Sequence, residues 1–311
     1  MHILNKTNYD ASKDDEIIIN EEVTEETDNK ISSGYTNFVI FGVDSRSNSL
    51  TKATRSDTIM LVGINNKTKE VKLCSIYRDT YVDVPSHGYT KINHAYAYGG
   101  YSLALSTINQ NFDLNVTQYV TVNFYAVTRI IDLLGGITLD IEQNELKWLN
   151  GYLKEINRVN GTSVSGLSHA GTQTVNGSQA LAYARIRYTA GGDYKRAERQ
   201  RIVVEKIFEK AKKSNLSTIT AIINEMLPKV ATNITTVQIL SLGKDILNYT
   251  IKDSIGFPFE KKSQKINRVS YVLPINLSNN VISLHEYLFD TMQYQPSNKV
   301  QTISDYISSI E

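Results

Sequence analysis

Three short apolar runs follow one another early in the chain, and each has the pattern of a β-strand. The runs are NFVIFGVD (37–44), DTIMLVGI (57–64) and EVKLCSIY (70–77), and runs of this length bounded by polar residues are typical of buried strands. The links between them are too short for a crossover helix, so neighbouring strands should run antiparallel. The pattern predicts a three-stranded meander.

Helical and strand patterns alternate in the rest of the chain. This alternation predicts a layered α/β sandwich on a mixed, largely antiparallel central sheet. Helices are expected over 100–111, 124–134, 175–184, 194–213, 216–228 and 235–247, and strands over 117–124, 136–141 and 268–274.

The first 30 residues differ in composition from the rest. They carry nine Asp/Glu against three Lys, whereas the whole chain has a net charge of only +1. We therefore expect a flexible acidic leader over 1–33 and a single domain over 34–311. No apolar run is long enough to span a membrane, and no signal-peptide pattern occurs, so the chain as given is expected to be soluble. The single cysteine, Cys74, lies in an apolar run, which excludes an intrachain disulfide.

Charged side chains mark the ends of the three early strands. In a meander, the end of the first strand, the start of the second and the end of the third share one sheet edge. That edge would carry Asp44, Arg55, Asp57, Arg78 and Asp79. Each residue alone could be an ordinary solvated ion-pair member, but their convergence favours a functional site.

A second charged cluster occupies residues 185–213, with ten Lys/Arg against four acids. Helical spacing places Arg196 and Gln200 on the apolar stripe of Val203, with Arg199 about 60° to one side. Arginine on a buried stripe must meet an anion, an acid or a cleft. Arg201, by contrast, is predicted to face solvent.

Arg185 and Arg187 precede the Gly191-Gly192 pair, after which a helix should start with Asp193 as its N-cap. If the Arg-x-Arg segment is extended, both guanidiniums share one face. Planar arginine forks near a helix N-terminus are suited to bind phosphate oxygens. Together with the paired aspartates, they suggest a pyrophosphate bridged by Mg²⁺, with Mn²⁺ as the alternative.

Six sequence motifs over about 36–212 identify a resemblance to the LytR-CpsA-Psr family. They are NFVIFGVDSR, RSDTIMLVGIN, CSIYRDTYV, KINHAYAYGG, LLGGITLDI and ALAYARIRY with GGDYKRAERQ, in the family's order. Tyr77 departs from the family pattern, which commonly has proline there. The resemblance implies a three-layer α/β/α fold that encloses a lipid tunnel. It also implies catalytic roles for Asp44, Arg55, Asp57 and Arg78, metal binding by Asp44 and Asp57, and phosphate binding by Arg78, Arg185, Arg187, Arg196, Arg199 and Gln200.

The activity that the resemblance implies is transfer of a glycopolymer, such as teichoic acid or capsule, from a polyprenyl-pyrophosphate carrier to a peptidoglycan sugar hydroxyl, with formation of a phosphodiester. The expected place is the extracellular face of the membrane, with an N-terminal transmembrane anchor missing from this chain. Hydrolysis of the same pyrophosphate and non-catalytic binding of the lipid phosphate remain alternatives. A polyanion-binding regulatory module is disfavoured, because the sequence lacks a helix-turn-helix pattern and places Arg196 on a buried stripe. We expect no nucleic-acid partner.

Overall fold

The computed structural model describes residues 16–23, 34–43, 50 and 54–310. The described residues form two compact units. The sheet unit comprises the described residues up to Thr121, then Ala231–Ile234 and the residues from Tyr249 onward, and the helical unit comprises Val122–Val230 and Thr235–Asn248. The chain therefore leaves the sheet unit after Thr121 and returns to it twice.

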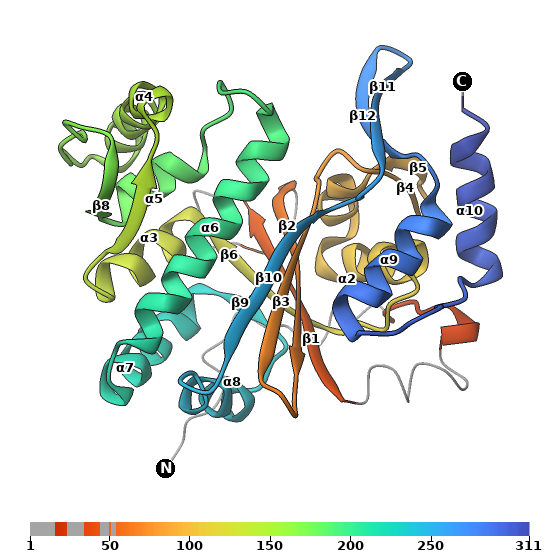
Figure 1. The fold of residues 1–311 in the computed structure, drawn as a ribbon, viewed down its shortest axis with the longest axis horizontal. Helices are drawn as coiled ribbons and strands as arrows, with labels where there is room; N and C mark the ends of the chain where they lie inside the picture. The colour runs from red at the N-terminus through yellow and green to blue at the C-terminus, as the bar shows by residue number, and fades with distance from the viewer. Residues whose placement is uncertain (1–15, 24–33, 44–49, 51–53, 311) are drawn as a thin grey trace. The chain divides into compact units, whose positions relative to one another are not determined.

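The sheet unit is built on a six-stranded sheet with the order β10-β3-β2-β1-β6-β9 (Figure 1). Two further hairpins, β4 with β5 and β11 with β12, accompany it. Its strands are β1 (Tyr35–Val43), β2 (Ser56–Asn65), β3 (Glu70–Ile76), β4 (Tyr81–Val84), β5 (Gly88–Lys91), β6 (Gln118–Asn123), β9 (Ala231–Thr232), β10 (Thr250–Phe257), β11 (Lys261–Ile266) and β12 (Val269–Pro274), and its helices are α2 (Ile92–Phe112), α9 (Leu277–Phe289) and α10 (Asn298–Ser308).

The predicted meander is confirmed. Strand β1 pairs antiparallel with β2, with Val39 opposite Leu61. Strand β2 pairs antiparallel with β3, with Leu61 opposite Cys74. These residues are all buried in the core, which includes the single cysteine. The neighbouring strands therefore run antiparallel, as the short links between them predicted.

Strand β10 makes the sheet mixed, and the sequence pattern did not reveal it. It pairs in parallel with β3, with Ile255 opposite Cys74. Most of its side chains are not fully buried, so the continuous apolar run that marks a central parallel strand is missing. The late strand expected over 268–274 is β12, which pairs with β11 in a separate hairpin.

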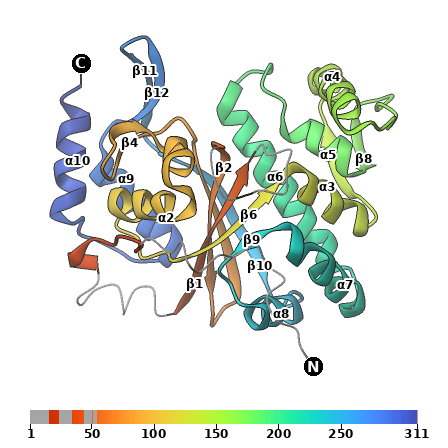
Figure 2. The same ribbon diagram turned by 180° about the vertical axis from the view of Figure 1, so that it is seen from behind.

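Helices α2, α9 and α10 supply the apolar partners of the sheet within this unit (Figure 2). Helix α2 contributes Leu105, Ile108 and Phe112 to the same core as Val39. The prediction of a helix over 100–111 captured only its second half, because the helix is kinked where Gly100 takes a positive φ of 65°. Only glycine adopts that conformation without strain.

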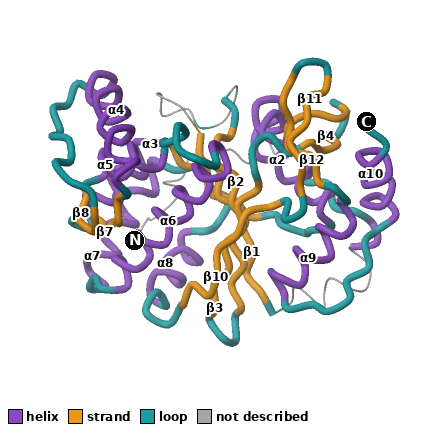
Figure 3. Tube along the Cα trace, turned by 45° about the horizontal axis from the view of Figure 1, so that its top comes forward, coloured by secondary structure: helices purple, strands orange, loops and turns teal. Residues whose placement is uncertain are grey.

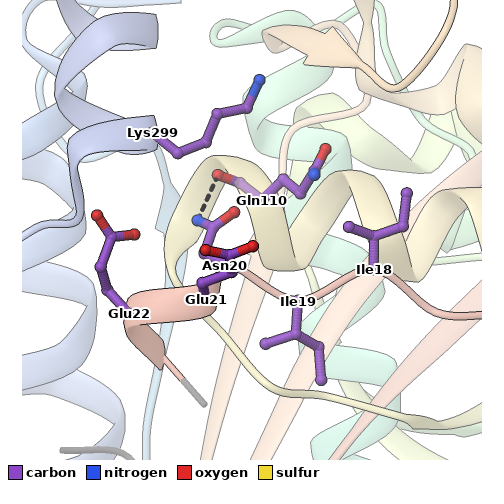
Figure 4. Close-up of a pocket in the computed structure, with 7 residues that line it drawn as sticks. All are labelled: Ile18, Ile19, Asn20, Glu21, Glu22, Gln110 and Lys299. Atoms are coloured by element: carbon purple, nitrogen blue, oxygen red, sulfur yellow. Dashed lines mark hydrogen bonds between the residues drawn. The ribbon is translucent and has the colours of Figure 1, made fainter. Parts of the chain in front are cut away.

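The structure differs from the expected flexible leader at residues 16–23, which pack against helix α2 within the sheet unit (Figure 4). Asn20 is buried and donates hydrogen bonds to Gln110 O at 3.1 Å and to Asp113 Oδ1 at 2.6 Å. Val23 is buried as well. A polar composition did not prevent packing, because the Asn20 amide has buried hydrogen-bond partners. The remainder of the predicted leader lies outside the described residues.

An open hollow of about 520 Å³ lies beside this docked segment. Figure 4 shows its walls, which come from the segment itself and from Gln110 and Lys299. None of the described residues that were predicted to bind phosphate or metal lines it.

The helical unit follows β6 and consists mainly of helices, with one small hairpin (Figure 3). Its elements are α3 (Phe124–Leu133), β7 (Ile137–Ile141), α4 (Gln143–Asn160), β8 (Gly171–Val175), α5 (Gly177–Ala184), α6 (Gly192–Lys212), α7 (Leu216–Met226), the 3₁₀ turn η3 (Leu227–Lys229) and α8 (Thr236–Lys244). The helices predicted after residue 120 match these bounds within a few residues. The sequence pattern did not predict helix α4.

The core of the helical unit lies between α4, α5 and the β7–β8 hairpin. Leu149 and Leu153 of α4 belong to the same buried cluster as three apolar side chains of β7, which are Ile137, Leu139 and Ile141. These side chains alternate along β7 with exposed ones, as expected for a half-buried strand. The hairpin and α4 therefore contribute to the same core.

The mixed α/β class with a mixed central sheet is confirmed. Among the described residues, no helix is both long enough and apolar enough to cross a membrane. The lipid tunnel stays a prediction.

Candidate functional site

The predicted sheet edge brings Asp57 and Arg78 together. Arg78 Nη1 lies 2.5 Å from Asp57 Oδ1, and the side chains of Arg78 and Asp57 remain 21% and 25% exposed. Asp57 lies near the start of β2, and Arg78 lies just beyond the end of β3, so the antiparallel pairing of these strands makes the contact. Asp44, the other predicted metal ligand, lies outside the described residues.

The turn after β3 continues this cluster. Asp79 pairs with Lys91 Nζ at 3.0 Å, and Asn93 N donates to Arg78 O at 3.2 Å, which joins the start of α2 to the turn. Arg55 is exposed just before β2. The pKa of His94 is lowered, mainly because the side chain is partly buried and further because the positive charges of Arg55 and Lys91 disfavour its protonated form.

Buried oxygen atoms without partners lie close to Asp57 in the chain. Thr54 Oγ1 and Ser56 Oγ are both buried and have no hydrogen-bond partner among the described residues. Such atoms are uncommon in folded proteins. No group of three or more His, Cys, Asp or Glu side chains within the described residues could hold a metal ion.

The arginines at 185 and 187 are held in the helical unit by acidic partners. Arg185 pairs with Glu155 at 3.4 Å and Arg187 with Asp193 at 3.3 Å, and 27% and 39% of the two arginine side chains remain exposed. The condition that the Arg-x-Arg segment is extended is not met at Arg185, which is the C-cap of α5 and has helical dihedral angles. Ile186 between them is buried.

Helix α6 begins earlier than predicted and without Asp193 as its cap. The N-cap is Gly191, in the left-handed region at φ 91°, so Asp193 falls in the first turn. There it accepts a hydrogen bond from Arg196 and forms ion pairs with Arg187 and Arg196. An acidic side chain in the first turn also interacts favourably with the helix dipole.

Arg196 lies on the buried side of α6, as its helical spacing predicted. Its side chain is 6% exposed and pairs with Asp193 at 3.3 Å, and its Nε has no hydrogen-bond partner among the described residues. Gln200, one turn later, is half-buried. Arg196 thus retains a buried donor without a partner among the described residues, which is uncommon in folded proteins.

Arg199 has a different environment from the one expected of a phosphate ligand. Its Nε donates to Glu145 Oε1 at 2.7 Å, and the two side chains are only 1% and 2% exposed. Nη1 donates to Ile186 O at 3.1 Å and Nη2 to Thr189 Oγ1 at 2.7 Å. Its guanidinium is therefore occupied by protein groups.

Sequence reasoning missed Glu145, because α4 was not predicted. Glu145 also accepts the backbone N–H of Glu142 at 2.9 Å and completes the capping box of α4. The signal available in the sequence was the Glu-x-x-Glu spacing of that box, before the apolar positions of α4. The Glu145 carboxylate thus contacts both the backbone at the start of α4 and Arg199 in the middle of α6.

The prediction that Arg201 faces solvent is wrong. Arg201 is 7% exposed, and its Nε and Nη1 are buried with no hydrogen-bond partner in the described part of the chain. The prediction assumed that α6 is buried only along the apolar stripe of Val203, but a second side of the helix is buried as well.

Comparison with known proteins places these residues in a family. The model of the LytR_cpsA_psr family matches residues 1–283. TagT of Bacillus subtilis, a polyisoprenyl-teichoic acid–peptidoglycan teichoic acid transferase, is 33% identical over 224 residues, which cover 71% of this chain and 62% of TagT. TagU of Oceanobacillus iheyensis, named for the same activity, is 33% identical over 268 residues, which cover 80% of this chain and 75% of TagU.

The likeness extends to solved structures. The family protein YwtF (TagT) with bound octaprenyl pyrophosphate lipid superposes with a TM-score of 0.62 at 25% identity, covering 86% of this chain and 95% of that one. The chain spans about half the length of some other curated relatives that it matches. The breadth of the family match, together with the shared fold, shows that this chain belongs to the LytR-CpsA-Psr family.

Proposed function

We propose that this protein transfers a glycopolymer from a polyprenyl-pyrophosphate carrier to a sugar hydroxyl of peptidoglycan. The observation that carries the proposal is the half-buried pair of Asp57 and Arg78 at the edge of the meander. The named activity of TagT and TagU and the octaprenyl pyrophosphate bound to YwtF support it. The lipid would occupy a tunnel, as the resemblance implies.

The proposed reaction exchanges one bond to phosphorus for another. The acceptor hydroxyl oxygen attacks the phosphorus that carries the glycan, and the bond from that phosphorus to the bridging oxygen breaks. Polyprenyl phosphate leaves with the bridging oxygen and its electron pair, and a phosphodiester joins glycan and acceptor. The hydroxyl proton passes to a base or to solvent. Arginine side chains stabilise the charge that develops on the phosphate oxygens.

The arginines divide into two proposed roles. In the sheet unit we propose Arg55 and Arg78 as phosphate ligands. In the helical unit, taken by itself, we propose Arg185, Arg187, Arg196 and Gln200. Arg199 is better suited to position the segment from Ile186 to Thr189 than to bind phosphate, because its donors already have partners.

The residues described fit a magnesium ion in part. Mg²⁺ usually takes one or two protein carboxylates together with waters and substrate phosphates, and so does not need a three-residue cage. We propose Asp57 with Asp44 as the protein ligands, and the unpartnered oxygens close to Asp57 agree with a polar ligand there. When bound, the ion would neutralise charge on the pyrophosphate.

We also propose that the protein acts at the extracellular face of the membrane, where the carrier lipid and peptidoglycan meet. A transmembrane anchor before this chain would hold it there.

The test is to incubate the protein with a polyprenyl-pyrophosphate glycan, magnesium and peptidoglycan oligomers, and to look for the phosphodiester product by mass spectrometry. Wild type should form it, and Asp57→Asn should not. Asp253→Asn is the matched control, because Asp253 is exposed on β10. Released glycan phosphate without a coupled product would indicate the hydrolase instead, and bound donor without turnover would indicate a lipid-binding protein.

A further inference from the structure

Three aromatic side chains of the helical unit form a continuous surface that we call the aromatic platform. It consists of Trp148 and Tyr152 of α4 and Tyr188 of the loop before α6. The ring centroids of Trp148 and Tyr188 are 4.8 Å apart, and those of Tyr152 and Tyr188 are 6.5 Å apart with an interplanar angle of 15°. Tyr188 nevertheless remains 68% exposed.

The buried ion pair of Arg199 and Glu145 supports both sides of the platform. On one side, Glu145 lies in the first turn of α4, three residues before Trp148. On the other, Arg199 donates to Ile186 O and Thr189 Oγ1, which flank Tyr188 in the chain. The residues on either side of Tyr188 are therefore held by hydrogen bonds from a buried side chain, as a preorganised binding surface requires.

The proposed phosphate ligands adjoin the platform. The guanidinium of Arg185 lies 5.4 Å from the ring centroid of Tyr152, and Tyr188 directly follows Arg187 in the chain. The pKa of Tyr152 is raised, mainly by burial and further by Tyr188. The positive charges of Arg187 and Arg185 oppose this shift without reversing it. The Arg185 guanidinium thus lies over the ring of Tyr152.

Core packing explains only part of this arrangement. Trp148 and Tyr152 pack against the core of the helical unit, which is sufficient reason for their positions. Tyr188 gains little burial, so core packing does not explain an aromatic residue at this position. An exposed aromatic face is, however, suited to a sugar ring, whose axial C–H groups form an apolar face within a polar rim.

We propose that the aromatic platform binds the sugar unit joined directly to the pyrophosphate of the donor. This inference rests on the proposed function. The first sugar of the donor is bonded directly to the pyrophosphate. If Arg185 and Arg187 bind the phosphate groups, that sugar must lie beside these arginines, where the aromatic platform is. It would make the protein bind the glycosylated carrier in preference to the bare lipid pyrophosphate.

The test compares two soluble probes, farnesyl pyrophosphate and farnesyl pyrophosphate carrying one N-acetylglucosamine. Trp148 is the only tryptophan of the chain, so its fluorescence reports directly on the platform, and calorimetry gives the affinity independently. Wild type should bind the glycosylated probe about tenfold more tightly, the size of one good stacking contact. That probe alone should shift the emission of Trp148.

Variants separate stacking from other effects. Tyr188→Ala should reduce the preference to less than about threefold while leaving the affinity for farnesyl pyrophosphate unchanged, and Tyr188→Phe should retain the preference. Tyr125→Ala is the matched control, since Tyr125 is an exposed tyrosine of the same unit. Equal affinity of wild type for the two probes would overturn this inference but not the proposed function. So would an equal loss of affinity for both probes in Tyr188→Ala. Failure of wild type to bind either probe would overturn the proposed function as well.

Discussion

Replacement of Arg199 by methionine should destabilise the helical unit strongly. The substitution leaves the carboxylate of Glu145 buried without its partner, since the two side chains are 1% and 2% exposed. Breaking a buried ion pair in this way costs about 3 to 5 kcal/mol of the free energy of unfolding. Two further hydrogen bonds, to Ile186 O and Thr189 Oγ1, are lost as well.

The assay is urea denaturation followed by the fluorescence of Trp148, which lies in the same unit. The matched control is Lys206→Met on the same helix, because Lys206 and Glu209 form a pair at 2.8 Å whose side chains are 34% and 53% exposed. That control should cost no more than about 1 kcal/mol. Equal destabilisation by the two substitutions would refute the claim that the pair of Arg199 and Glu145 is desolvated.

The double substitution Glu145→Leu with Arg199→Met separates stability from positioning. Removing both charges removes the unpaired buried carboxylate, so the double variant should recover most of the lost stability. It should still turn over poorly, because the segment that carries Arg187 and Tyr188 has lost its anchors. Full activity in this variant would show that the ion pair positions nothing.

Three further predictions concern the sheet unit. Arg78→Ala should lower turnover, measured as product formation, about 10²- to 10³-fold because a phosphate contact is lost. The control Arg268→Ala, on the exposed β11–β12 turn, should leave turnover unchanged. Burial lowers the pKa of His285 to about 4, so the unfolded chain takes up the proton first, and stability should fall by roughly 3 kcal/mol as pH drops from about 6.5 to 4. His285→Gln should remove this dependence in urea titrations at several pH values. Asn20→Ala should cost about 1 to 3 kcal/mol, because it leaves the buried carboxylate of Asp113 short of a donor, and hydrogen exchange should become faster in the segment that carries the substitution.

The meander could be predicted because its information is local. Short links dictate antiparallel neighbours, and the strand ends then bring Asp57 and Arg78 to one edge. Strand β10 could not be predicted in the same way, because its partner β3 is far away in the sequence and its side chains lack a strong apolar pattern.

The arginine cluster shows a similar limit. Helical spacing correctly placed Arg196 on a buried side of α6, but spacing on one helix does not show which element covers each side. Arg199 faces Glu145 of α4, and Arg201 is buried. A partner on an unpredicted helix cannot be inferred from the helix that it contacts.

The parallel pairing of β10 with β3 has a consequence for how the chain folds. Strand β3 ends at Ile76 and β10 starts at Thr250, so the helical unit must be synthesised before β3 acquires its second neighbour. Pairing across so long a separation is slow, because the loop must close before the contacts form. Until then β3 has an unpaired edge, which is a site for association with other chains. A chain that ends before β10 should therefore aggregate, even though it contains every motif of the family resemblance.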